Sequence, residues 1–145
     1  MKASAFIDTN VFLYTDDDEF PDKKAVAIAL VADHQRSGLA LVSMQVLQEY
    51  FAAATRKLGV APDLAQRKVE LMARLRVVRL MENDVIAAIE FHRLHGTSFW
   101  DSLIIQAARL GGASLLYTED MQHGAMLAGI RIVNPFLPRP CNLPG

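Results

Sequence analysis

Four acidic residues far apart in the chain are the side chains whose type and placement point to chemistry: Asp8, Glu49, Asp101 and Asp120. Two like charges about 4 Å apart repel by about 4 kcal/mol at an effective dielectric of about 20. Several carboxylates therefore converge only where protons or cations offset the repulsion. Magnesium and manganese prefer such oxygen ligands, and they can polarise a phosphodiester and activate a bound water. An acidic cluster without a Cys–His set predicts phosphoryl chemistry rather than structural zinc.

Each of these residues also has an ordinary structural explanation. Asp101 falls three positions after Ser98, where a negative side chain favours a helix start. Asp120 is placed to cap a helix over 121–128. Glu49 lies off the centre of an apolar helix face, as a surface glutamate does. Asp8 is harder to explain in this way because it ends a buried apolar run. The metal-site hypothesis therefore depends on all four residues together.

Length and composition predict a single globular domain. The chain has 145 residues, of which 52% are hydrophobic, and its 15 basic and 16 acidic residues give a net charge of −1. A nucleic-acid binder that relied on charge alone would be more basic. The lone Cys141 fits a reducing compartment. Because no run approaches about 20 apolar residues and Asp8 interrupts the first one early, we expect a soluble, cytoplasmic protein.

Short apolar runs alternate with segments of helical periodicity. The expected strands cover 5–7, 39–42, 77–80, 114–117 and 130–133. The expected helices cover 22–37, 43–58, a segment opening at Pro62, a segment capped by Asn83, 98–110 and 121–128. This alternation predicts an α/β domain over 1–136, with a mostly parallel sheet of about five strands flanked by helices. The proline-rich residues 137–145 are expected to form a tail.

The expected topology brings the acidic residues together. In an open parallel sheet, ligands bind outside the carboxyl ends of the strands. Asp8 directly follows the first expected strand, and Asp120 follows the fourth within three residues. Asp101 lies in the first turn of one expected helix, and Glu49 lies about two turns into another. One cleft at the strand ends can therefore gather all four.

Four sequence motifs in this order resemble those of PIN-domain nucleases, in particular the VapC-type toxins of bacterial toxin–antitoxin pairs. The similar segments, which together span roughly 5–136, are FIDTNVFLY, SMQVLQEY, SFWDSLIIQAA and LLYTEDM. Each motif alone is a weak pattern. Their order and spacing make the resemblance specific.

The resemblance implies a magnesium-dependent endoribonuclease, with manganese as a possible substitute. Asp8 and Asp101 would be the principal metal ligands, and Glu49 and Asp120 would complete the acidic pocket. Two polar residues would hydrogen-bond within the site, Asn10 and Thr118. The resemblance also implies an RNA substrate, a VapB-like antitoxin partner and a homodimer.

Some alternatives remain open from the sequence. A non-catalytic, metal-holding RNA-binding or regulatory module would carry the same acids. A haloacid-dehalogenase-type phosphatase is disfavoured, because Asn10 stands where its second aspartate belongs and no lysine follows residue 68. Glu119 can either add charge to the site or face solvent. Basic residues between Arg56 and Arg79 can contact RNA phosphates or simply form a solvated face.

Overall fold

A six-stranded sheet forms the centre of the protein, for which a computed structural model describes residues 3–138. The strand order is β3-β2-β1-β4-β6-β5, and all neighbours are parallel except β5 and β6. The strands are β1 (Ala5–Ile7), β2 (Ala40–Ser43), β3 (Arg76–Val78), β4 (Leu115–Tyr117), β5 (Met126–Leu127) and β6 (Ile130–Val133). The predicted α/β class and mostly parallel sheet are confirmed, with one strand more than expected.

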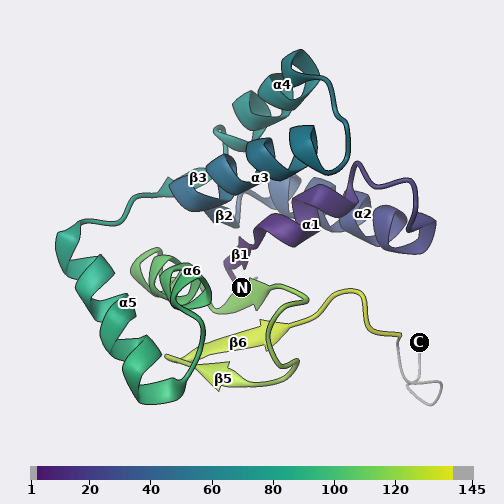
Figure 1. Cartoon of the computed structure of the whole chain (residues 1–145). Helices are drawn as coiled ribbons and strands as arrows, with labels where there is room; N and C mark the ends of the chain where they lie inside the picture. The colour runs from purple at the N-terminus through teal and green to yellow at the C-terminus, as the bar shows by residue number, and fades with distance from the viewer. Residues whose placement is uncertain (1–2, 139–145) are drawn as a thin grey trace.

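The helices lie in two groups about this sheet (Figure 1). The first group connects β1 to β2 and β2 to β3, and consists of α1 (Thr9–Tyr14), α2 (Pro21–Ser37), α3 (Met44–Arg56) and α4 (Pro62–Met72). The second group, α5 (Glu82–His95) and α6 (Phe99–Leu110), returns the chain from the edge strand β3 to β4. α6 packs on the sheet and α5 packs outside it. Right-handed crossovers place the two groups on opposite faces.

Most helix ends follow the expected signals. Ser43 and Ser98 cap α3 and α6 through their hydroxyls, and Gly38 ends α2 in the left-handed conformation at φ 72°. The expectation for α5 was wrong by two residues: Asn83 lies inside the helix, and the N–H of Met81 donates to Asp84 at 2.9 Å. The short helix α1 was not predicted, because six residues are too few to show a clear helical period.

The predicted helix over 121–128 is absent, and turns followed by β5 occupy this segment. β5 pairs with β6 through a tight turn at Ala128 and Gly129, both of which have positive φ. Gly124 within this stretch disfavours a helix, and antiparallel pairing with β6 satisfies its backbone. Asp120 therefore lies in a loop and caps no helix.

The core lies under the two central strands. All of β1 is buried, and the buried face of α6 packs against β2 and β3. Gly111 permits this packing, because a Cβ at that position would lie 2.6 Å from Leu41 and 2.8 Å from Val78. Within residues 3–138, no helix is long and apolar enough to span a bilayer. Cys141 and most of the predicted tail lie outside the described residues.

Candidate active site

Asp8 is the most buried of the four acids and lies where β1 ends at the middle of the sheet. Its side chain is 4% exposed. The N–H of Thr9 donates to Oδ1 at 2.7 Å, which also caps α1, and the Thr118 hydroxyl donates to Oδ2 at 2.8 Å. Burial raises the pKa of Asp8 to about 7, the two hydrogen bonds oppose this, and the charges of Asp120 and Glu49 add to it. The protein therefore holds a carboxylate where ionisation is costly.

Thr118 and Asn10 join Asp8 to Asp120. The Thr118 hydroxyl accepts from the Asn10 side-chain amide at 3.2 Å and from the Asp120 N–H at 3.1 Å, while it donates to Asp8. The same Asn10 amide donates to Asp120 Oδ2 at 2.9 Å. β1 and β4 are parallel neighbours, so residues about 110 positions apart meet where these strands end. The network contains both polar residues that the sequence had indicated.

Glu49 reaches the site through a residue that the sequence analysis did not identify. The Thr9 hydroxyl donates to Glu49 Oε1 at 3.2 Å. Glu49 is exposed beside the buried face of α3, and its charge contributes to the raised pKa of Asp8. A hydroxyl residue directly after the buried aspartate was the available signal for Thr9.

Asp101 serves the helix start and also faces the other acids. Its N–H donates to the Ser98 hydroxyl at 3.1 Å, as expected at the start of α6. Its pKa is raised by burial, lowered by Ser98 and raised by the charge of Asp120. Asp101 and Asp120 line a shared pocket of about 290 Å³. The two explanations given for Asp101 are therefore compatible.

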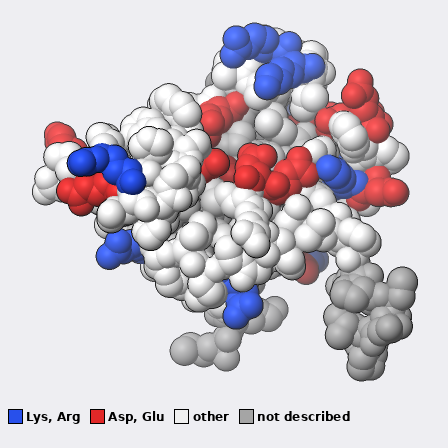
Figure 2. All heavy atoms as spheres, turned by 60° about the horizontal axis from the view of Figure 1, so that its bottom comes forward, with Lys and Arg blue, Asp and Glu red and all other residues white. Residues whose placement is uncertain are grey.

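The donor chemistry of this cluster fits a hard cation, because every candidate ligand is an oxygen. Acidic side chains gather in a band across the middle of one face in Figure 2, with basic side chains at its margins. As the side chains stand in residues 3–138, no three Asp, Glu, His or Cys residues lie close enough to hold one ion. Asp8 and Asp120 instead accept hydrogen bonds from Thr118 and Asn10. Because each carboxylate oxygen has two lone pairs, these hydrogen bonds can persist while the acidic side chains move closer together around an ion.

Comparison with protein families gives a direct match. The family described as PIN domain matches residues 5–126, which is most of the chain. This chain belongs to the PIN domain family. Among curated proteins, none is similar enough in sequence to count as a match.

Solved structures share the PIN fold at low sequence identity. The toxin VapC20 of Mycobacterium tuberculosis, described as cleaving the sarcin–ricin loop, is 21% identical, with a TM-score of 0.66 over 81% of this chain and 92% of that one. A toxin–antitoxin complex from Klebsiella pneumoniae is 19% identical, with a TM-score of 0.63 over 92% of this chain and 98% of that one. A DNA-bound VapBC from Salmonella typhimurium is 20% identical, with a TM-score of 0.63 over 90% of this chain and 97% of that one. At these identities the similarity establishes the fold alone.

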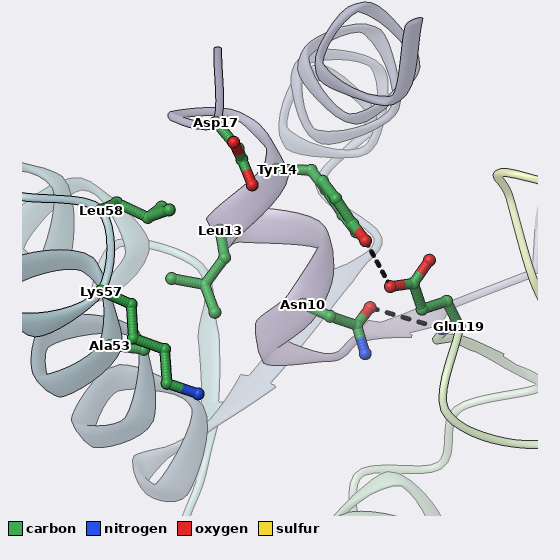
Figure 3. Close-up of a pocket in the computed structure, with 8 residues that line it drawn as sticks. All are labelled: Asn10, Leu13, Tyr14, Asp17, Ala53, Lys57, Leu58 and Glu119. Atoms are coloured by element: carbon green, nitrogen blue, oxygen red, sulfur yellow. Dashed lines mark hydrogen bonds between the residues drawn. The ribbon is translucent and has the colours of Figure 1, made fainter. Parts of the chain in front are cut away.

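Glu119 lies in this PIN domain but turns away from the acidic cluster. Its carboxylate accepts from the Tyr14 hydroxyl at 2.5 Å (Figure 3). It also pairs with Lys23 at 2.9 Å. Its backbone N–H faces Asn10 Oδ1 at 3.4 Å. The Glu119 side chain thus connects α1 and α2 to the loop after β4. It neither adds its charge to the acidic cluster nor faces solvent freely, which were the two alternatives considered from the sequence.

Proposed function

We propose that this PIN domain is a magnesium-dependent endoribonuclease, the toxin of a VapBC-type toxin–antitoxin pair. The observation that carries the proposal is the buried Asp8, whose pKa is raised in part by the charges of Asp120 and Glu49. A fold gains nothing in stability from acids arranged in this way, so the arrangement indicates a site that binds a cation.

The proposed roles are those that the resemblance implies, and the hydrogen bonds from Thr118 and Asn10 to Asp8 and Asp120 support the two orienting roles. Asp8 and Asp101 would hold the ion, and Glu49 and Asp120 would complete its surroundings directly or through water. Thr118 and Asn10 would orient Asp8 and Asp120. A bound Mg²⁺ supplies positive charge that polarises the phosphodiester and lowers the pKa of the attacking water.

The proposal is tested with purified, partner-free protein and RNA, with Mg²⁺ or Mn²⁺ and with a chelator. We expect cleavage that stops with the chelator, and a loss of at least about a hundredfold in Asp8→Asn and Asp101→Asn. Glu90→Gln removes one exposed charge on α5 and serves as the matched control. Tight RNA binding without cleavage would favour the non-catalytic RNA-binding or regulatory module.

We further propose that the protein forms a homodimer in the cytoplasm. Large apolar side chains are exposed where α5 and α6 begin, including Met81 at 65%, just before α5, and Trp100 at 63%, in the first turn of α6. They border a hollow of about 500 Å³. A second copy of this chain would cover this surface. Sedimentation should show a dimer, and Ile86→Asp, at an exposed α5 position, should shift it towards monomer.

The proposed antitoxin partner is supported by the fold. Two of the structures that share it are described as a toxin–antitoxin complex and a DNA-bound VapBC. Co-expression with the product of the adjacent reading frame, followed by co-purification and relief of growth arrest, tests this part of the proposal.

A further inference from the structure

A second pocket, of about 230 Å³, lies between α1 and α3 beside the acidic cluster (Figure 3). One wall comes from α1, on which Asn10, Leu13 and Tyr14 recur at helical spacing and share one face. Asp17 continues this face one turn later, just after α1 ends. The motif FIDTNVFLY ends at Tyr14, so Asp17 is the residue of this wall that lies outside the motif.

The other wall is mostly apolar. Ala53 and Lys57 are four residues apart at the end of α3, and Leu58 follows them. With Leu13 opposite, Ala53 and Leu58 form half-buried apolar sides. Such walls suit a flat aromatic group that has left its stack, because every nucleobase has an apolar face.

Most polar groups of the pocket are already occupied. The Tyr14 hydroxyl donates to Glu119, and the Asn10 amide is used by Thr118 and Asp120. Asp17 Oδ1 accepts the Glu19 N–H at 3.1 Å, and its other oxygen has no hydrogen-bond donor within residues 3–138. Figure 3 shows this carboxylate directed between Leu13 and Tyr14. The pocket therefore offers a hydrogen-bond acceptor at this end.

Lys57 supplies the pocket's available positive charge. Its side chain is exposed, and none of the ion pairs among the described residues involves it. Lys23, by contrast, is engaged by Glu119 and Tyr14. An occupant that suits the pocket therefore has an aromatic body, hydrogen-bond donors for Asp17 and a negative group for Lys57.

The pocket is linked to the proposed active site by one hydrogen bond. Asn10 lines the pocket and donates to Asp120, which lines the pocket shared with Asp101. An RNA strand whose scissile phosphate lies at the acidic cluster would therefore bring an adjacent base to the space between α1 and α3.

We infer that this pocket is a base-binding subsite that selects guanine in the nucleotide beside the cleaved bond. Guanine presents two adjacent donors, N1–H and its amino group, which match the acceptor-only carboxylate of Asp17. Uracil has one N–H donor between two carbonyls, and adenine and cytosine each have a ring acceptor beside the amino group, so none of them offers two adjacent donors to one carboxylate. A cationic peptide segment suits the pocket less well, since Lys57 would repel it. The inference rests on the proposed ribonuclease function.

Binding can be measured without any cleavage. In ¹³C-methyl spectra with Mg²⁺ present, GMP should shift the Leu13 and Leu58 signals saturably, at concentrations about tenfold or more below those of AMP, CMP or UMP. Asp17→Asn can still accept the Glu19 N–H and should lose this discrimination. Ala53→Leu fills the pocket and should abolish the shifts, whereas Ala52→Leu, at the adjacent exposed position, should retain them.

Cleavage of RNAs that carry a single guanine at successive positions provides the second arm. Preferential cleavage beside guanine that disappears in Asp17→Asn supports the inference. Cleavage without base preference, with unmoved Leu13 and Leu58 signals, overturns it while the ribonuclease proposal stands. Selective GMP shifts without any cleavage support the guanine pocket while the ribonuclease proposal fails. Shifts caused only by an arginine-containing peptide overturn the subsite in favour of a protein partner.

Discussion

Asp8→Asn is expected to make the metal-free protein more stable at pH 8, although it removes a proposed metal ligand. Asp8 is 4% exposed, and burial raises its pKa from 3.8 to about 7. Below pH 4 the side chain is protonated in both the folded and the unfolded chain, so the variant gains nothing there. Between about pH 4 and pH 7 the unfolded chain has already lost this proton, whereas the folded chain still holds it on the buried carboxyl. Stability is lost over that interval.

The size of the effect follows from the two pKa values. They differ by about three pH units, each worth about 1.4 kcal/mol, which sets an upper limit of about 4 kcal/mol at pH 8. The asparagine side chain can still accept from the Thr9 N–H, but it loses the Thr118 hydroxyl as a donor to Oδ2. A gain of about 2 to 3 kcal/mol remains after that loss.

Urea denaturation from pH 4 to pH 8 in the presence of chelator measures this difference, with Glu90→Gln as the control that should show none. Adding Mg²⁺ at pH 8 should stabilise the original protein and leave Asp8→Asn little changed, because only the former keeps the ligand. If Asp8→Asn is no more stable than the original protein at pH 8 in chelator, burial does not strain Asp8, and the argument for a cation site loses its main support.

Three other substitutions test the fold by urea denaturation. Gly111→Ala should lower the free energy of unfolding by about 1 to 3 kcal/mol, because its Cβ would collide with Leu41. An unchanged urea midpoint would show that α6 and β2 can move apart to make room. Ala128→Asn should raise the free energy of unfolding by about 1 kcal/mol, because Ala128 has φ 51° and asparagine tolerates this left-handed conformation. A less stable variant would contradict the left-handed turn between β5 and β6. Lys68→Met should cost about 1 to 2 kcal/mol, because it leaves the half-buried Asp16 without its cation; no loss would mean that water replaces the lysine.

The acidic site could be predicted because its residues follow from strand ends. Asp8 ends a fully apolar run, and a charge in that position has few structural uses. Asp120 follows a second apolar run, and the two strands are parallel neighbours, so one alternation of helices and strands placed both residues at the same edge. Ser43 and Ser98 fixed two helix starts, which located Glu49 and Asp101.

Other features depend on tertiary contacts that local pattern does not encode. The segment after Asp120 carries apolar residues at spacings that suit a helix, but Gly124 disfavours the helix, and β5 instead pairs with β6 through the turn at Ala128 and Gly129. The guanine pocket needs α1 and α3 to face each other, and α1 is too short for its period to be visible. Thr9 required knowledge that its hydroxyl lies near a helix 40 residues away.

The position of β4 in the sheet determines when the acidic cluster can form during folding. β4 lies between β1 and β6, although β1 is formed by the first residues of the chain and β4 by residues more than 100 positions later. A nascent chain can pair β1 with β2 and β2 with β3, yet Asp8 lacks its partner Thr118 until the residues that follow β4 have been made. Such a chain contains Asp8 and Glu49 but not yet Thr118 and Asp120. The acidic cluster therefore forms only when β4 inserts beside β1, which is the strand pairing with the largest sequence separation in this sheet.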